Sequence, residues 1–238
     1  MTDYTISTSQ ETPLMFAAKT GDLDTLMKLI QSDLGLDEVD SNGRTAFLKA
    51  CIGGEFQAAK FLLNAGAQIN ARDNNGQTAA HFTVLDRSSQ RAIRFLKQLL
   101  IKNKADLNVC DVSGFTPLML CAKSRYYKFL SKGRPDLIKI LIDAKVDVNY
   151  KNSDGRNALM IAAADGNADV CELLLSAGAW PLTQTDADLS EIMKVAKDDF
   201  RAHFDTLIQN SKILQSIQTA DIGQMLSQST KRIITRRL

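Results

Sequence analysis

Apolar residues along this chain recur in short clusters of helical spacing, separated by polar turns rich in Gly, Asp and Asn. Over residues 45–77, the apolar positions fall at i, i+1, i+3 and i+4, which predicts a short helix that begins after Thr45 and ends at a pair of glycines. A second apolar stripe starts at Phe56, and Gly66 stands where a left-handed helix end is expected. The pattern predicts helix, turn, helix and then a hairpin-like loop.

This unit returns along the chain. Its opening residue recurs at Thr12, Thr45, Thr78, Thr116 and Asn157, with a degenerate copy at Ser190. The spacings are 33, 33, 38, 41 and 33 residues. A period of this size indicates a stacked array in which each unit packs only on its neighbours.

Several copies share residues that resemble the ankyrin-repeat family over about residues 7–210. They are T-P-L-M at 12–15 and 116–119, T-A-A-H at 78–81, L-L-N-A-G-A at 62–67, L-L-S-A-G-A at 174–179, and the turns at 40–43, 73–76 and 111–114. The resemblance implies an all-α solenoid of about six L-shaped helix-turn-helix-hairpin units. Its concave face would be built from the hairpins and the first helices.

The expected division follows the repeats. Residues 1–11 form a lead-in, the five repeats span 12–44, 45–77, 78–115, 116–156 and 157–189, residues 190–213 form a degenerate sixth repeat or cap, and residues 214–238 form a C-terminal helical tail. The tail has two open interpretations: a helical cap with a frayed end, or a signal for a partner, a membrane surface or secretion.

Two departures from the regular period stand out. Repeats 3 and 4 are longer by 5 and 8 residues, and we expect both extra stretches around the turn between the two helices. Lys104 and Lys145 occupy the position of Gly66 and Gly178. Because a left-handed lysine costs more than a glycine, those helix ends are expected to close differently.

Charge adds a further distinction between the repeats. The net charge is +2, yet residues 87–139 carry 12 Lys and Arg against 3 Asp and Glu, between two acidic flanks. The inserted stretch 124–135 is basic and holds three aromatic residues. It is interpreted equally as a protrusion that docks an acidic or phosphorylated partner segment, or as an extension of the first helix with solvated lysines.

The family resemblance places recognition on the hairpin tips and the first helices, and the basic insertions add to that set. The candidate partner-binding residues are Asn42, Arg44, Lys49, Asn75, Arg87, Arg91, Arg94, Phe115, Lys123, Arg125, Tyr126, Tyr127, Lys128, Lys132, Arg134 and Arg156. Phe115 has two interpretations of equal weight: an aromatic anchor for a partner, or a ring that packs on a neighbouring hairpin.

The sequence gives little support for catalysis. The phosphate-binding, dinucleotide-binding, zinc-protease and serine-hydrolase motifs are all absent. His81 occupies the family's T-x-x-H position, where a structural hydrogen-bonding role between turns is expected. With two histidines, and four cysteines without a C-x-x-C pair, we predict no metal site and no cofactor.

We therefore predict a non-enzymatic scaffold that grips a protein partner with an acidic surface. The alternatives are a regulatory or inhibitory subunit of an enzyme, and a bacterial effector that acts on a host protein. Nucleic acid ranks below these because the acidic flanks would repel a duplex. Free cysteines and the absence of a signal peptide at the polar start favour a reducing intracellular compartment, or delivery into a host cell without such a signal. The sequence leaves the oligomeric state open.

Overall fold

The computed structural model describes residues 11–31, 35–86, 89–103, 105–123, 134–179 and 206. Within these ranges the chain forms ten helices and no strand. The helices are α1 (Pro13–Thr20), α2 (Leu23–Gln31), α3 (Ala46–Gly53), α4 (Phe56–Asn64), α5 (Ala79–Leu85), α6 (Ser89–Asn103), α7 (Pro117–Ala122), α8 (Pro135–Asp143), α9 (Ala158–Ala164) and α10 (Ala168–Ser176). The units expected at 190–213 and 214–238 lie outside these ranges, apart from Thr206.

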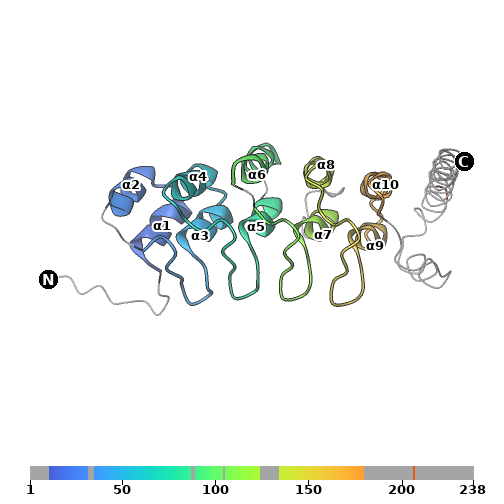
Figure 1. The fold of residues 1–238 in the computed structure, drawn as a ribbon, viewed down its shortest axis with the longest axis horizontal. Helices are drawn as coiled ribbons and strands as arrows, with labels where there is room; N and C mark the ends of the chain where they lie inside the picture. The colour runs from blue at the N-terminus through green and yellow to red at the C-terminus, as the bar shows by residue number, and fades with distance from the viewer. Residues whose placement is uncertain are drawn as a thin grey trace, which may run out of the picture.

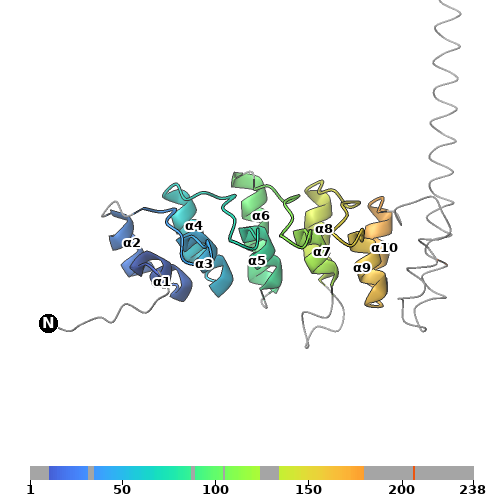
Figure 2. The ribbon, with the colours of Figure 1, turned by 90° about the horizontal axis from the view of Figure 1, so that it is seen from below.

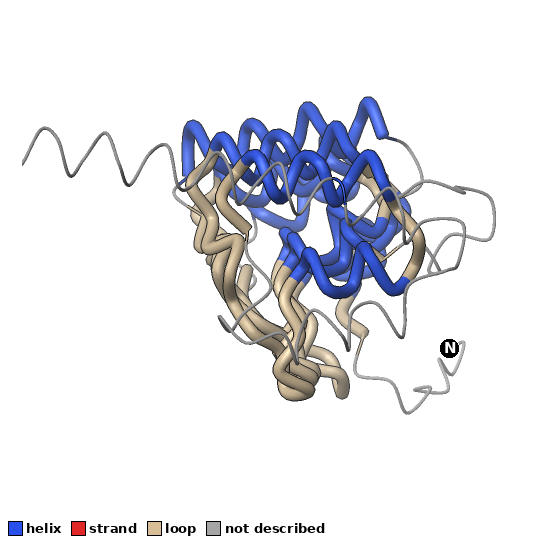
Figure 3. The backbone as a smooth tube through the Cα atoms, turned by 90° about the vertical axis from the view of Figure 1, so that its right-hand side faces the viewer, coloured by secondary structure: helices blue, strands red, loops and turns tan. Residues whose placement is uncertain are grey.

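The helices form two parallel layers. The odd-numbered helices make an inner row and the even-numbered helices an outer row, with one helix pair per repeat (Figure 1). Long loops project from the inner row on one side, and the view along the array shows each unit as an L (Figure 3). The repeats follow one another along the long axis (Figure 2). The expected all-α solenoid is confirmed.

The inner helices begin where the repeat pattern predicts. The opening side chain of four repeats accepts a hydrogen bond from the backbone N–H three residues later, which satisfies one of the amides that a helix start leaves without a partner. These bonds join Thr12 to Met15 (3.3 Å), Thr45 to Leu48 (3.3 Å), Thr116 to Met119 (3.4 Å) and Asn157 to Met160 (2.9 Å).

One continuous core runs along the array between the two helix layers. It extends from Leu14 in α1 to Ala179 after α10. Small residues such as Ala50 and Ala59 are fully buried, so that neighbouring helices approach closely, while Phe47 fills the space between layers. Because each repeat contributes only part of this core, the stability of one unit depends on its neighbours.

The extra residues of repeats 3 and 4 lie in different places. Repeat 4 carries them between α7 and α8, as predicted. In repeat 3 the prediction is wrong, because α6 starts at the usual distance from Thr78 and is itself longer, with 15 residues where α4 has 9. The apolar stripe of α6, including the buried Phe95 and Leu99, continues through the added turns and packs on the core.

The expectation for Lys145 is also wrong. Lys145 adopts the left-handed conformation with φ 62°, close to the 84° of Gly178. The two backbone bonds that close α8, from Lys145 N–H to Ile142 O (2.9 Å) and from Val146 N–H to Leu141 O (3.3 Å), match those after α10. The buried Val146 and these bonds hold the helix end in the regular form against the strain of a side chain there. Lys104 lies outside the described residues.

No helix in the described ranges has both the length and the apolar character that crossing a membrane requires.

Candidate functional site

The four described hairpin turns share one device. Each opens with an Asp or Asn whose Oδ1 accepts two backbone hydrogen bonds, from the residues two and four positions later, and this fixes the turn. The pairs of donors are Asn42 and Arg44 on Asp40, Asn75 and Gln77 on Asp73, Ser113 and Phe115 on Asp111, and Asp154 and Arg156 on Asn152, all at 2.8–3.0 Å. One side-chain oxygen per turn is therefore enough to build the hairpin.

Consecutive hairpins are stacked by backbone bonds. Asn74 N–H donates to Asn42 O (2.8 Å), Val112 N–H to Asn75 O (2.9 Å), and Ser153 N–H to Ser113 O (3.4 Å). The stacking is tight, because a Cβ on Gly114 would lie 2.6 Å from the nitrogen of Ser153. The hairpins thus present their tips in register. We call the surface made by these turns and the adjoining side of the inner helices the inner face.

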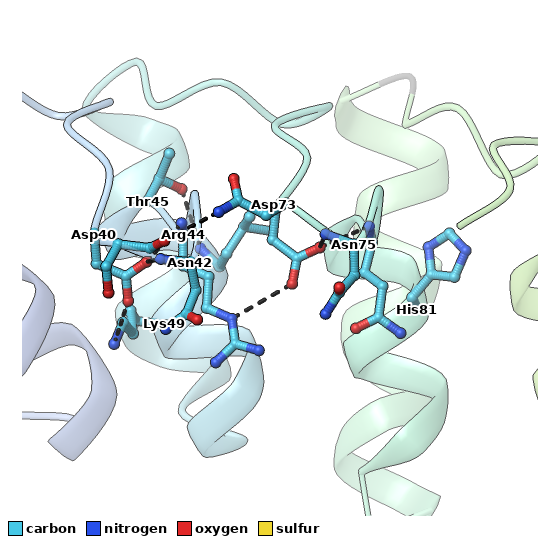
Figure 4. Close-up of polar contacts among 12 residues, drawn as sticks. Asp40, Asn42, Arg44, Thr45, Lys49, Asp73, Asn75 and His81 are labelled. Carbon is cyan, nitrogen blue, oxygen red and sulfur yellow. Dashed lines mark hydrogen bonds and ion pairs between the residues drawn. The ribbon is translucent and has the colours of Figure 1, made fainter. Parts of the chain in front are cut away.

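At the first junction of the inner face, Asp40 uses its second oxygen to bind a lysine. Lys49 Nζ lies 2.8 Å from Asp40 Oδ2 and 2.9 Å from Glu11 Oε1, and the lysine is buried (Figure 4). Burial alone would raise the pKa of Asp40, but the bonds from Lys49 and from two backbone amides outweigh it and lower that pKa. Burial alone would lower the pKa of Lys49, but its bonds to the two carboxylates outweigh burial and raise that pKa.

The second junction repeats this pairing with an arginine. Arg44 Nε lies 3.4 Å from Asp73 Oδ2, and the Arg44 guanidinium lies 5.9 Å from the centre of the Phe82 ring (Figure 4). Arg44 thereby joins the first hairpin to the second and to α5. Both acids of the first two junctions are already satisfied by cations of this chain.

His81 links α5 to the third hairpin. Its Nδ1 accepts from the Thr78 backbone N–H at 3.1 Å, so the proton resides on Nε2, which donates to Phe115 O at 3.0 Å. Burial lowers the pKa of the imidazole. The neutral ring therefore serves as a bridge between turns, which confirms the structural role expected for it.

The last described junction differs from the first two. Between repeats 4 and 5 the inner face has a hollow of about 280 Å³. It is lined by Phe115, Lys123, Asn152, Asp154, Arg156, Ile161, Ala164 and Asp165. Lys123 Nζ lies 5.0 Å from the centre of the Phe115 ring. The Phe115 ring is half-buried against the core and also lines this hollow.

The hollow unites three residues that the sequence nominated separately: Phe115, Lys123 and Arg156. Sequence reasoning missed Asn152. The signal was present, because the same turn position holds Asp40, Asp73 and Asp111 in the earlier repeats.

The basic residues of α6 belong to a different surface. Arg91 and Arg94 line a hollow of about 150 Å³ with Phe56, Lys60 and other residues of α4 and α6, in the outer helix layer. Arg91 also contacts the preceding repeat, through the Gly54 carbonyl and through Glu55 at 3.8 Å. Arg91 and Arg94 therefore do not extend the inner face.

Two of the nominated cations are buried and are held by the protein itself. Arg134, 3% exposed, donates to the carbonyls of Val84 and Asp86 and so ties the start of α8 to the end of α5. Lys49 is bound by two acids, as described. A partner could reach either cation only by breaking these bonds.

Two nominated residues, Asn42 and Asn75, are exposed at hairpin tips. The remaining nominated residues lie outside the described ranges: Arg87, Arg125, Tyr126, Tyr127, Lys128 and Lys132.

Cys51, Cys121 and Cys171 are buried free thiols in the helices. Burial raises the pKa of each, to about 12 for Cys121, so these thiols stay protonated and unreactive. No cluster of His, Cys, Asp and Glu able to hold a metal ion occurs among the described residues.

The L-shaped units, the Asp- or Asn-capped hairpins and the T-x-x-H bridge define a class of repeat protein. The family model for ankyrin repeats (3 copies) matches residues 2–73 and 89–186, and the chain belongs to the ankyrin-repeat family.

Its curated relatives include two kinds of Notch protein. The chain is 32% identical over 186 residues to neurogenic locus notch homolog protein 1 of Xenopus tropicalis. This match covers 71% of this chain and 7% of that protein. It is 34% identical over 143 residues to neurogenic locus notch homolog protein 2 of Homo sapiens. That match covers 60% of this chain and 5% of that protein. The chain thus spans only a small fraction of the relatives it matches.

Proposed function

We propose that this chain is a non-catalytic module that binds an extended acidic segment of a partner protein along its inner face. Ankyrin repeats are generally protein-interaction modules, which supports the coarser part of the proposal. The finer part rests on one observation: cations lie over aromatic rings at two places on the inner face, Arg44 over Phe82 and Lys123 over Phe115. Such a surface offers acidic and apolar side chains complementary contacts.

The first repeats add apolar area to the same surface. Phe16 in α1 is 60% exposed and Ile52 in α3 is 38% exposed. Phe16 stands at the same repeat position as Lys49, which faces the hairpin, and Ile52 stands at the position of Lys123, which lines the hollow. Exposed aromatic and aliphatic side chains beside cations are typical of the anchors of protein interfaces.

The test is affinity capture followed by mass spectrometry with two matched double variants. Phe16→Glu with Ile52→Glu adds two negative charges to the inner face, and Gln57→Glu with Gln98→Glu adds two to exposed positions of the outer helices. We expect the first pair to lose a specific protein that the wild type and the second pair retain. Equal capture by all three proteins would contradict the proposal.

Salt gives a second measure. If acidic groups of the partner meet the cations of the inner face, capture should weaken when the salt concentration is raised, because screening shortens the reach of exposed charges. Capture that does not depend on salt would exclude an acidic partner and favour an apolar one.

The basic insertion of repeat 4 is a further part of this proposal. Its support is the sequence alone: Arg125, Tyr126 and Tyr127 belong to residue types that are enriched in binding hot spots. Replacing these three residues by Ala should reduce capture of the same partner. Unchanged recovery would limit docking to the inner face. If the captured protein is an enzyme, its activity with and without this chain tests the regulatory alternative.

A further inference from the structure

The hollow between repeats 4 and 5 contains a buried donor without an acceptor. Asn152 is 6% exposed and lines the hollow. Its Oδ1 accepts the amides of Asp154 (3.0 Å) and Arg156 (2.8 Å), which fixes the orientation of the carboxamide and leaves Nδ2 as the second polar atom. This Nδ2 has no hydrogen-bond partner among the described residues. An orphaned buried donor is costly and rare, so it points to a missing acceptor.

Comparison with the first two junctions shows what the missing group replaces. At Asp40 the second polar atom meets Lys49, and at Asp73 it meets Arg44. The corresponding positions around Asn152 hold Ile161 and Phe115, which offer no charge. Neither of these two positions therefore supplies a cation to a second carboxylate oxygen, whereas the amide of Asn152 places a buried donor there.

Two cationic side chains share the hollow with Asn152. Arg156 and Lys123 line the same hollow as Asn152. Arg156 stands at the turn position of Arg44, whose acid is Asp73 of the next hairpin. Arg156 itself makes no ion pair with an acid in the described part of the chain. The hollow thus combines an amide donor and a guanidinium, with an ammonium beside them.

The two acids that line the hollow offset its positive charge, but neither accepts a hydrogen bond from Asn152 Nδ2. Asp154 is exposed at the hairpin tip, and Asp165 lies half-buried at the end of α9 and has interactions of its own. These two carboxylates balance the two cations, so selection depends on the buried donor and the adjacent guanidinium and not on net charge. Charge-assisted hydrogen bonds of this kind are roughly twice as strong as neutral ones.

We infer that this hollow receives one carboxylate side chain, a Glu or Asp, from an extended partner segment, with Asn152 Nδ2 and Arg156 as its donors. The carboxylate takes the place that Asp73 fills for Arg44 within the protein, and the Phe115 ring forms the apolar wall beside its stem. The inference rests on the proposed function, because it names the feature of the partner that the inner face selects.

The test is a nuclear magnetic resonance titration of the 15N-labelled full chain. The probes are the blocked tripeptides acetyl-Gly-Glu-Gly-amide and acetyl-Gly-Gln-Gly-amide, which differ in charge and not in size. The Glu peptide should shift the side-chain signals of Asn152 and Arg156, and the Gln peptide should bind about tenfold more weakly. Equal binding of the two peptides, or no shift of the Asn152 amide signals, would overturn the inference without any variant.

A variant sharpens the result. Asn152→Asp keeps the turn acceptor, since Asp40, Asp73 and Asp111 hold the same position in the other hairpins, and replaces the donor by an oxygen. We expect this variant to melt like the wild type and to lose its response to the Glu peptide. An unchanged response would also overturn the inference. If Asn152→Asp still captures a partner that Phe16→Glu with Ile52→Glu loses, the proposed function stands and the carboxylate subsite does not.

Discussion

The first and last junctions of the inner face use the same turn for different purposes. At Asp40 and Asp73 the first side-chain oxygen holds the backbone and the second holds a cation of the neighbouring repeat. At Asn152 the side-chain oxygen does the same for the backbone, but Nδ2 is buried without a partner in a residue that lines a hollow. The difference shows that the hairpin needs one oxygen only, which leaves the second atom available either for stability or for recognition.

Alanine at these positions gives the largest expected effect. Asp73→Ala removes the acceptor of two backbone amides and the acid of Arg44, and should lower the free energy of unfolding by about 3 kcal/mol. Asn152→Ala removes only the acceptor and should cost about 2 kcal/mol. Urea unfolding followed by circular dichroism measures both. Equal losses would mean that the ion pair adds nothing at the second junction.

Exchanging Asp and Asn at these turn positions changes only the second polar atom of the side chain and so isolates its contribution to stability. Asp73→Asn keeps the turn and removes the charge opposite Arg44, so we expect a loss of about 1 kcal/mol. Asn152→Asp should change the free energy of unfolding by about 0.5 kcal/mol or less, because the cost of burying a carboxylate is offset by nearby Arg156 and Lys123. The same urea experiment applies. A large loss for Asn152→Asp would contradict the equivalence of the four turns.

His81 links α5 to the third hairpin, and protonation of its ring should weaken that link. Since burial puts its folded pKa below the unfolded value of 6.5, the unfolded state takes up the proton first. The contribution of the neutral ring is complete above pH 6.5 and is lost as the pH falls below it, with a slope of at most about 1.4 kcal/mol per pH unit.

The measurement is the unfolding midpoint between pH 5 and pH 8. His81→Gln is the control, and it should be less stable at pH 8 and lack this slope. The chain has only one other histidine, so a slope that persists in the variant would assign the effect to carboxylates or to His203.

The smallest expected effect concerns the ends of the outer helices. Gly66 and Lys145 hold the same left-handed position, with φ 104° and 62°. Lys145→Gly should raise the free energy of unfolding by about 0.5 kcal/mol, because relief of the left-handed strain exceeds the added entropy of the unfolded chain. Thermal unfolding checks this, with Lys151→Gly in the exposed loop as the control. A destabilised Lys145→Gly would show that the lysine side chain makes a compensating contact.

Much of the fold could be predicted because its determinants are local. The caps Thr12, Thr45 and Thr116 and the period of the apolar stripes place the inner helices, and the Asp-to-Gly spacing places the turns. The length of α6 could not be placed by counting residues, because α6 continues past the length of α4 where Leu99 packs on the core. Lys145 shows the same limit, since the backbone bonds that close α8 and the burial of Val146 outweighed its conformational preference.

The sequence by itself determined the repeat and the family, and it nominated residues for binding. Only the tertiary structure decided which of these share a surface: Arg134 and Lys49 turn inward to carbonyls and acids, Arg91 joins the outer layer, and Phe115, Lys123 and Arg156 meet Asn152 in one hollow. The physical reason is that capping and periodicity act within one repeat, whereas the partner of a side chain on the inner face belongs to the next repeat along the array.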